Sequence, residues 1–390
     1  MSRWLIKKFS GLFYRLHCWL EERSYSPNFS PYRVETQNIP GLPRIVHFNG
    51  NFVIGGSSQL IVDLVERTGN SYSHTVIVPE VPRPLPYKPL NIHRFSLQHI
   101  TAMQAYLKKE KPALAHVHYW VRHYDRFRDF SFWYQAVFKI CEELSIPVIQ
   151  NINVPTRPYE SGSVIHNIYV SRYVAQEFNG DNPTPHSVIY PGSDMRHFSN
   201  DQIEALPRNT IGMMYRLDPD KLNEAGIDVF IQLAKNNPGL HCYIIGDGPL
   251  VIPYKRKVKS NGLNSQFSFP GFIGYRDLPG YYKKMSIIIA PVHDESFGQV
   301  SPFAMGMGLA VAGYDTGALG EILGSTETLA QTGDVKSLVQ IVQGLIDNTE
   351  RRIQLGKKNQ ERARKWFSTE EMIKKYEALY QSCLNPVMSP

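Results

Sequence analysis

The residues best suited to chemistry lie in one segment of the 390-residue chain, at 291–308. An apolar run at 287–290 ends at Pro291, and it is followed by Glu295, Gly298 and a stretch with helical character. A carboxylate just after a buried strand can hold hydroxyl groups by short, charge-assisted hydrogen bonds. A helix beginning next to Gly298 would point backbone amides at an anion. The segment therefore predicts a ligand that carries both hydroxyl groups and negative charge.

Two basic residues and two glycine turns indicate where the negative charge would bind. Arg216 and Lys221 lie five residues apart after an apolar run, and they could clamp a diphosphate and stabilise the charge that develops as it leaves. A solvated surface pair of cations is the alternative. Gly55 and Gly56 precede a helix and Gly246 follows a strand, so each turn could bring amides to a phosphate. A tight strand-to-helix connection would explain the same glycines.

Alternating apolar runs and amphipathic stretches predict the elements that position these residues. Strands are expected at 44–48, 74–78, 113–117, 147–151, 167–170, 187–190, 210–214, 241–245, 268–270, 287–290 and 309–312. Helices are expected at 60–67, 101–109, 130–144, 228–235, 277–284, 299–307, 334–347, 350–366 and 369–381. This alternation is typical of parallel sheets with helices on both faces.

The strand series restarts after a polar connector at 194–208, which predicts two domains. The expected fold is α/β, with two Rossmann-like domains facing a central cleft, and ligands of such sheets bind beyond the carboxyl ends of the strands. The expected segments are an N-terminal extension and connector at 1–42, an N-terminal Rossmann-like domain at 43–195, a C-terminal Rossmann-like domain at 208–368, and a C-terminal helix at 369–390 that could return to the N-terminal domain.

Composition excludes several classes of protein. Hydrophobic residues make up 42% and charged residues 20%, as in soluble globular proteins. The net charge of +7 favours anionic partners, but the basic residues are spread along the chain, so no nucleic acid is expected. The four cysteines lie far apart without a CxxC pair, which argues against a disulfide framework or a zinc site and for a cytoplasmic location. No apolar run approaches the roughly 20 residues of a membrane span.

Residues 1–25 have aromatic and leucine residues at helical spacing with basic residues between them, which predicts an amphipathic helix. The segment lacks the apolar core and the cleavage site of a secretory signal. One interpretation is a helix packed on the surface of the protein. The other is a helix at a membrane surface, which would make the protein peripheral on the inner face of the membrane.

The segment around Glu295 resembles the retaining glycosyltransferases with two Rossmann-like domains, the GT-B architecture. The family pattern is Pro-Ser-x-x-Glu-Gly-Phe-Gly and then Glu-Ala-Met-Ala, and this chain reads Pro-Val-His-Asp-Glu-Ser-Phe-Gly and then Phe-Ala-Met-Gly. Five further matches follow the family order: the Gly55-Gly56 turn, the His-x-His strand end at 116–118, the hinge at 190–198, the pair Arg216 and Lys221, and the Gly-containing stretch at 316–321. The resemblance covers about 44–381, and it implies that 43–195 is the acceptor-side domain and 208–368 the nucleotide-sugar domain.

The resemblance implies a retaining, metal-independent hexosyltransferase that needs no cofactor. It would move a hexose from a UDP- or GDP-sugar to a glycan or lipid-linked acceptor in polysaccharide biosynthesis. Glu295 would contact the hydroxyls of the transferred sugar, and Arg216 and Lys221 would neutralise the leaving diphosphate. Further residues implied to line the donor site are Gly55, Gly56, Gly246, Ser296, Phe297, Gly298, Gln299, Val300 and Phe303.

Two departures from the family pattern qualify this expectation. Phe303 stands where the family has a second Glu that holds the ribose hydroxyls, and a phenyl ring cannot accept a hydrogen bond from them. Asn153 stands where the family often has a His that touches the donor sugar, and an amide can bind a hydroxyl but cannot act as an acid or base at neutral pH. His118 is a candidate to replace that His, with an ordinary buried histidine as the alternative.

Phe303 also supports a second hypothesis. The chain would then be a catalytically weak or inactive member that binds a nucleotide sugar or glycan as a partner subunit. A nucleotide-sugar epimerase of the same architecture is a third hypothesis, which the Glu-Ser-Phe-Gly segment disfavours.

Overall fold

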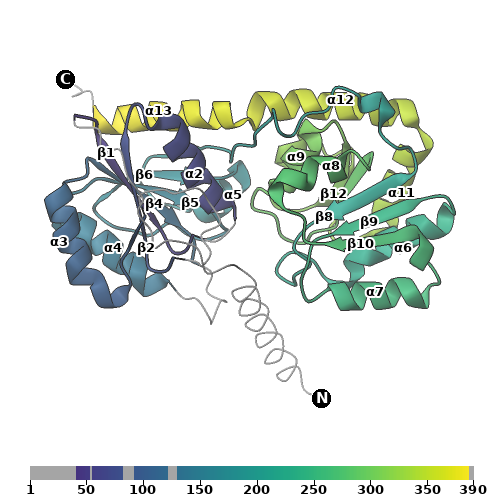
Figure 1. Cartoon of the computed structure of the whole chain (residues 1–390), viewed down its shortest axis with the longest axis horizontal. Coiled ribbons are helices and arrows are strands. Elements are labelled where there is room, and N and C mark those ends of the chain that lie inside the picture. The colour runs from purple at the N-terminus through teal and green to yellow at the C-terminus, as the bar shows by residue number, and fades with distance from the viewer. Residues whose placement is uncertain (1–40, 53–54, 82–91, 122–129, 386–390) are drawn as a thin grey trace, which may run out of the picture. The chain divides into compact units, whose positions relative to one another are not determined.

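The structure is a computed structural model that describes residues 41–52, 55–81, 92–121 and 130–385 (Figure 1). The amphipathic helix expected at 1–25 lies outside these residues. Contacts between residues divide the chain into two compact units. Unit 1 contains the described residues up to Ile168 together with Asp181–Ser187 and the end of the chain from Glu377, and unit 2 contains Tyr169–Gly180 and Val188–Tyr376.

Unit 1 is built on a seven-stranded sheet with the order β3-β2-β1-β4-β5-β6-β7. The strands are β1 (Arg44–Asn49), β2 (Ser73–Val78), β3 (Ile92–Arg94), β4 (Leu114–Tyr119), β5 (Val148–Ile152), β6 (Val164–Tyr169) and β7 (His186–Val188). The pairs from β3 across to β5 are parallel. The central strands β1, β4 and β5 are buried along nearly their whole length, as expected where helices cover both faces.

Helices lie on both faces of this sheet. They are α2 (Gly56–Thr68), α3 (Ile100–Glu110), α4 (Ser131–Glu143) and the end of α13 (Thr369–Leu384). The ring of Trp133 on α4 contacts Phe48 on one face. On the other face, Thr68 of α2 hydrogen-bonds His74, and Tyr380 of α13 hydrogen-bonds His116. Figure 1 shows α3 and α4 together on one side of the sheet.

Unit 2 is built on a six-stranded parallel sheet with the order β10-β9-β8-β11-β12-β13. The strands are β8 (Thr210–Met214), β9 (His241–Ile245), β10 (Phe267–Gly271), β11 (Ile287–Ala290), β12 (Ala310–Asp315) and β13 (Leu329–Gln331). The direction of the strand order reverses between β8 and β11, the two strands at the centre of the sheet. In sheets of this kind, ligands bind at such a switch point, beyond the carboxyl ends of the strands.

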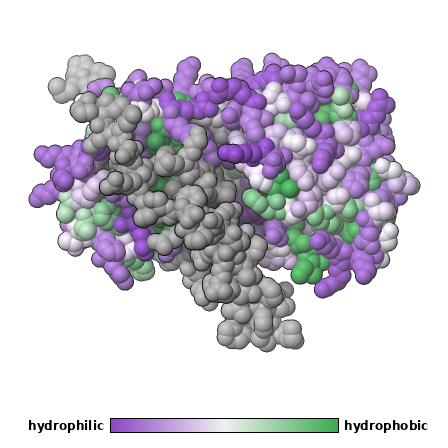
Figure 2. All heavy atoms as spheres, in the orientation of Figure 1, coloured by the Kyte–Doolittle hydropathy of each residue, from purple (hydrophilic) through white to green (hydrophobic). Residues whose placement is uncertain are grey.

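The helices of unit 2 are α5 (Arg172–Phe178), α6 (Asp228–Asn236), α7 (Val251–Ser260), α8 (Leu278–Tyr282), α9 (Val300–Gly306), α10 (Leu319–Leu323), α11 (Val335–Asp347), α12 (Thr349–Trp366) and the first part of α13. Figure 2 shows a largely hydrophilic surface along α12, with small hydrophobic patches elsewhere. One of these patches lies over the start of α7, where Ile252 is 68% exposed. Isolated apolar residues of this kind are normal on a protein surface.

The expected α/β fold with two parallel-sheet domains is confirmed. The sequence prediction missed β3, β13, α5, α7 and α10. The first turn of α7 contains Pro253 and the helix is dense in lysine, so its apolar periodicity is weak. None of the helices in the described residues has both the length and the apolar character needed to cross a membrane.

Candidate functional site

Glu295 and Lys221 are the centre of the candidate site in unit 2. Glu295 follows β11 and is 3% exposed, and its Oε1 accepts a hydrogen bond of 2.9 Å from Lys221 Nζ. The same ammonium donates to Asp294 O at 3.1 Å, and the His293 amide donates to Lys221 O at 3.0 Å. The structure thus brings two of the residues selected from the sequence into direct contact, in surroundings where the low dielectric strengthens their attraction.

Two glycines shape the backbone around Glu295. Gly298 has a φ of +58°, and a Cβ on it would lie 2.2 Å from Glu295 Oε2. Gly317 has a φ of +54°, and a Cβ on it would lie 2.0 Å from Glu295 O. That same carbonyl accepts a hydrogen bond of 2.8 Å from the Ala318 amide. Any side chain at either glycine would therefore displace Glu295, and both positions require glycine.

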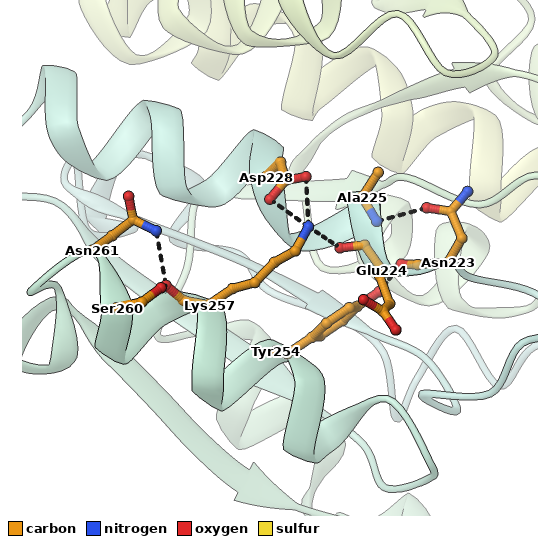
Figure 3. Close-up of polar contacts among 8 residues, drawn as sticks. All are labelled: Asn223, Glu224, Ala225, Asp228, Tyr254, Lys257, Ser260 and Asn261. Carbon is orange, nitrogen blue, oxygen red and sulfur yellow. Dashed lines mark hydrogen bonds and ion pairs between the residues drawn. The ribbon is translucent and has the colours of Figure 1, made fainter. Parts of the chain in front are cut away.

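The loop that carries the predicted phosphate-binding lysine is fastened to α7 (Figure 3). The ammonium of Lys257 lies 2.9 and 2.8 Å from the two carboxylate oxygens of Asp228 and donates to Glu224 O at 2.8 Å. Tyr254 OH donates to Asn223 O at 2.7 Å. The bonds to Glu224 O and Asn223 O hold the backbone of the loop, so α7 helps to position it.

Arg216 lies on the same loop and pairs with Asp220 at 2.7 Å, with 66% of its side chain exposed. An exposed pair of this kind contributes little stability, so the guanidinium can change partner at little cost. Gly246 packs directly on this loop: its φ is +129°, and a Cβ on it would lie 1.9 Å from Tyr215 O. The close approach of two strand-end loops therefore explains Gly246, and its contact with a phosphate stays a prediction.

Ser296 and Phe297 are held by neighbouring parts of unit 2. Ser296 O accepts a hydrogen bond of 2.7 Å from Ser171 Oγ. The ring of Phe297 is 3% exposed and stacks on Tyr190, with centroids 5.6 Å apart, while Phe367 meets it edge-on at 5.5 Å. The ring of Phe297 thus has a packing role, and contact of Ser296 and Phe297 with a donor stays a prediction.

Gln299 and Val300 begin α9. The Gln299 side chain donates to Gly192 O at 3.0 Å, which ties the loop after β7 to this helix. Val300 is the first residue of the helix, where backbone amides have no partner inside the helix. The proposed approach of an anion to these amides remains a prediction.

Phe303 faces other aromatic residues and is 8% exposed. Its ring stacks on Phe198 with centroids 3.9 Å apart and an interplanar angle of 8°, and the edge of Tyr275 meets it at 5.8 Å. The residue that replaces the family's second Glu is therefore part of a packed aromatic cluster.

Gly55 and Gly56 stand at the start of α2 in unit 1. Gly55 has an extended backbone, with a φ of 172°, and a Cβ on it would meet nothing within 4 Å. Its carbonyl accepts the first helical hydrogen bond, from the Gln59 amide at 2.9 Å. The local fold alone does not explain a glycine at 55, so a ligand contact there stays a prediction.

His118 and Asn153 lie at the carboxyl edge of the unit 1 sheet. His118 is fully buried on β4, in register with Asn49 of β1. Asn153 follows β5, and its backbone N–H donates to Tyr119 O at 3.3 Å. Burial lowers the pKa of His118 to about 3, so the imidazole is neutral at pH 7 and can donate one hydrogen bond and accept one.

Within the described residues, one group of three could hold a metal ion: His47, His116 and His118, whose ligand nitrogens all lie within 4.8 Å of one another. All three are fully buried. A metal would have to replace the hydrogen bond of 3.1 Å between His47 Nδ1 and His118 Nε2, and the group includes no carboxylate to offset a buried dication. The hydrogen-bonded arrangement therefore favours a network of neutral imidazoles, and the expected absence of a metal stays a prediction.

Glu321 has contacts that the sequence reasoning missed. Its Oε1 accepts from the Arg172 amide and from Tyr190 OH, both at 2.7 Å, and its Oε2 accepts from the Tyr173 amide at 3.0 Å. Burial and this carboxylate raise the pKa of Tyr190 to about 12. Glu321 therefore holds the start of α5 in place within unit 2. Its place at the end of the Gly-containing stretch at 316–321 was the signal for it.

Comparison with known proteins adds to this geometry. Residues 195–362, which include the whole unit 2 site, match the family model described as glycosyl transferases group 1. The 2-deoxystreptamine N-acetyl-D-glucosaminyltransferase of Streptomyces fradiae is 30% identical over 116 residues, which cover 29% of this chain and 28% of that protein. The lipopolysaccharide core biosynthesis mannosyltransferase LpsB of Rhizobium meliloti is 26% identical over 218 residues, 51% of this chain and 62% of LpsB. These alignments span less than two thirds of either relative.

Solved structures show the fold over a larger part of the chain. HepE of Anabaena in complex with UDP superposes with a TM-score of 0.73 over 87% of this chain and 100% of HepE, at 15% identity. The complex of HepE with UDP-glucose superposes with a TM-score of 0.71 over 87% of this chain and 99% of HepE, at 16% identity. At this identity the likeness shows that the two proteins share a fold, and no more than that.

Proposed function

We propose that this chain transfers a hexose, with retention, from a nucleoside diphosphate sugar to a glycan or lipid-linked acceptor, because residues 195–362 match the family model of the group 1 glycosyl transferases. The observation that carries the proposal is the contact between Lys221 and the buried carboxylate of Glu295 at 2.9 Å. It joins a cation suited to a phosphate with a carboxylate suited to sugar hydroxyls. The UDP and UDP-glucose bound by HepE support a donor of this class.

In the proposed reaction the donor diphosphate takes over the ammonium of Lys221 and the exposed guanidinium of Arg216. Both cations stabilise the negative charge that grows on the leaving phosphate as the glycosidic bond breaks. Glu295 accepts hydrogen bonds from hydroxyls of the transferred sugar and orients its ring. The acceptor hydroxyl attacks from the face that the phosphate leaves and gives its proton to a phosphate oxygen, so the anomeric configuration is retained.

Since two side-chain cations are available for the diphosphate, we expect transfer without a divalent metal. Treatment with EDTA should then leave the rate unchanged, and a rate that falls with EDTA and recovers with Mg²⁺ or Mn²⁺ would contradict this part of the proposal.

Release of UDP or GDP from UDP- and GDP-hexoses tests the proposed function, because slow transfer of the sugar to water needs no known acceptor. We expect release by the wild-type protein, and a loss of at least about tenfold in Glu295→Gln, which removes the charge but keeps the size of the side chain. NMR of the released sugar should first show the donor's anomeric configuration. Tight donor binding without any release would favour the inactive, sugar-binding alternative.

A further inference from the structure

Unit 1 contains four buried histidines on one face of its sheet. His47 on β1 is in register with His116 on β4, and His118 lies two residues further along β4. His74 on β2 is in register with Ile45, which places it on the same face as His47. The first three are fully buried and His74 is 8% exposed. Imidazole rings are costly to bury unless they are hydrogen-bonded, so their partners decide what they do.

Three of these histidines form a continuous chain with a threonine of α2. Thr68 Oγ1 donates to Leu64 O at 2.7 Å and lies 2.8 Å from His74 Nε2. His74 Nδ1 lies 2.9 Å from His47 Nε2, and His47 Nδ1 lies 3.1 Å from His118 Nε2. Each link is within normal hydrogen-bond distance.

The threonine fixes the direction of every bond in this chain. A hydroxyl has one proton, and Thr68 gives it to a carbonyl that can only accept, so His74 Nε2 must be the donor to Thr68. A neutral imidazole has one donor and one acceptor. His47 must therefore donate from Nε2 to His74, and His118 must donate from Nε2 to His47. This series of hydrogen bonds ends with a lone pair on His118 Nδ1.

Burial keeps the hydrogen-bonded histidines neutral. It lowers the pKa of His74 to about 4 and that of His118 to about 3. The pKa of His47 is also well below its ordinary value, because of burial and the neighbouring His74 and His118. At neutral pH no ring carries the second proton that would disturb the order of donors and acceptors.

Two further polar groups without partners lie at the carboxyl ends of the strands on either side of β4, where His118 also lies. His118 Nδ1, Asn49 Nδ2 and Asn153 Nδ2 are buried, and none of them has a hydrogen-bond partner in the described part of the chain. The two amides are already oriented, because Asn49 Oδ1 accepts from Trp120 Nε1 at 2.9 Å and Asn153 Oδ1 accepts from Asn151 Nδ2. One acceptor and two donors on neighbouring strand ends complement hydroxyl groups, which both donate and accept.

We propose that Thr68, His74 and His47 are positioning residues that hold His118 as its Nε2–H tautomer, so that Nδ1 accepts a hydrogen bond from a sugar hydroxyl. This inference rests on the proposed function for the identity of the ligand. The tautomer itself is a property of the sugar-free protein. Only His118 would touch the sugar. The other three residues act through it, because they determine which of its nitrogens has the proton.

The matched variants are Thr68→Val and Thr68→Ser. Valine has nearly the shape of threonine but no hydroxyl, so His74 loses its acceptor. The donors and acceptors along the series of histidines can then exchange roles, which would place a proton on His118 Nδ1. Serine keeps the hydroxyl and should keep the wild-type order. Long-range ¹H–¹⁵N spectra of protein with ¹⁵N-labelled histidine distinguish the two tautomers, and the His118 signals are identified by their loss in His118→Gln.

We expect the Nε2–H tautomer of His118 in the wild type and in Thr68→Ser, and a shift to Nδ1–H in Thr68→Val. The ratio of the Kd for UDP to the Kd for UDP-glucose, with GDP and GDP-mannose as the second pair, should fall by about tenfold in Thr68→Val and recover in Thr68→Ser. A purely structural threonine would change stability without changing the tautomer.

An Nδ1–H tautomer in the wild type, or an unchanged tautomer in Thr68→Val, would overturn the proposal. So would stoichiometric binding of Zn²⁺ that is lost in His116→Gln, because the three histidines would then be metal ligands. If the tautomers behave as expected but neither nucleotide sugar binds, the positioning chain is supported and the proposed transferase function fails by itself.

Discussion

At the scale of single residues, the site in unit 2 depends on the fit of one buried carboxylate. Glu295 is held through its side chain by Lys221 and through its backbone by the Ala318 amide. Lys221 has 16% of its side chain exposed, so removal of Glu295 would leave a largely buried ammonium without its charged partner. The carboxylate thus contributes to stability as well as to the proposed chemistry.

Glu295→Ala should therefore unfold more easily than Glu295→Gln, because the amide of glutamine can still accept a hydrogen bond from Lys221. Loss of one partner of a buried ion pair costs about 3–5 kcal/mol, and the partial exposure of Lys221 places the expected cost near or below the lower figure. Urea unfolding of both variants measures it. Equal midpoints for the two variants would show that Lys221 does not depend on Glu295.

Gly298→Ala should impair transfer by moving the carboxylate, since the new Cβ would lie 2.2 Å from Glu295 Oε2. Gly262→Ala is the matched control: its φ is +72°, and a Cβ there meets nothing within 4 Å. Both variants carry the strain of a left-handed backbone, about 1 kcal/mol, but only the first one displaces Glu295. Nucleotide release should fall at least tenfold more in Gly298→Ala. A similar loss in both would assign the effect to strain alone.

At the scale of elements, the site is positioned by helices that do not carry its functional groups. Helix α7 holds the loop after Lys221 through Lys257 and Tyr254 (Figure 3). Helix α2 fixes the histidine chain of unit 1 through Thr68. The side chains of α7 contact backbone oxygens of the loop that carries Lys221. The Thr68 side chain of α2 contacts the ring of His74 in the sheet.

Lys257→Met should loosen the loop and weaken binding of the nucleoside diphosphate by about three- to tenfold, in line with the loss of one charge-assisted hydrogen bond. Lys259→Met on the same helix is the control for the loss of a positive charge. Titration calorimetry with UDP and GDP measures both variants. An equal effect of the two would mean that overall charge, rather than the contact with Asp228 and Glu224, determines affinity.

The main elements, and the position of Glu295 just after β11, follow from local patterns in the sequence. Apolar runs predicted β1, β8 and β11, and the Glu-Ser-Phe-Gly segment marked the candidate site. The pairing of Lys221 with Glu295 could not be predicted, because the two residues are 74 positions apart and meet only where β8 lies beside β11 in the sheet. The histidine chain depends likewise on the register between β1, β2 and β4, which no local pattern specifies.

At the scale of the whole molecule, the buried histidines couple stability to pH. His47, His74, His116 and His118 all have a pKa below the ordinary value of about 6.5 because burial disfavours the charged ring. The unfolded chain therefore binds more protons below pH 6.5 than the folded chain does. Their contribution to stability is complete above pH 6.5 and is lost as the pH falls toward the folded-state values.

Between pH 7.5 and pH 5.5 each of these histidines should lower the free energy of unfolding by about 1.3 kcal/mol, or about 5 kcal/mol for the four together, a large part of the stability of an ordinary domain. Urea unfolding at the two pH values tests this. His74→Gln should reduce the loss by about one quarter. A stability that is the same at pH 5.5 and 7.5 would show that the rings titrate normally and are not buried as described.

The central claim is that Lys221 binds the diphosphate and Glu295 the sugar of one donor, and calorimetry with UDP, UDP-glucose, GDP and GDP-mannose tests it most directly. The claim predicts that Lys221→Met weakens the nucleoside diphosphate and its sugar alike, by about tenfold or more, whereas Glu295→Gln weakens only the nucleotide sugar. The double variant Lys221→Met/Glu295→Gln, which leaves neither charge unpaired, controls for damage to the site. Wild-type affinity for a nucleotide sugar in both single variants, or the absence of any binding by the wild type, would contradict the claim.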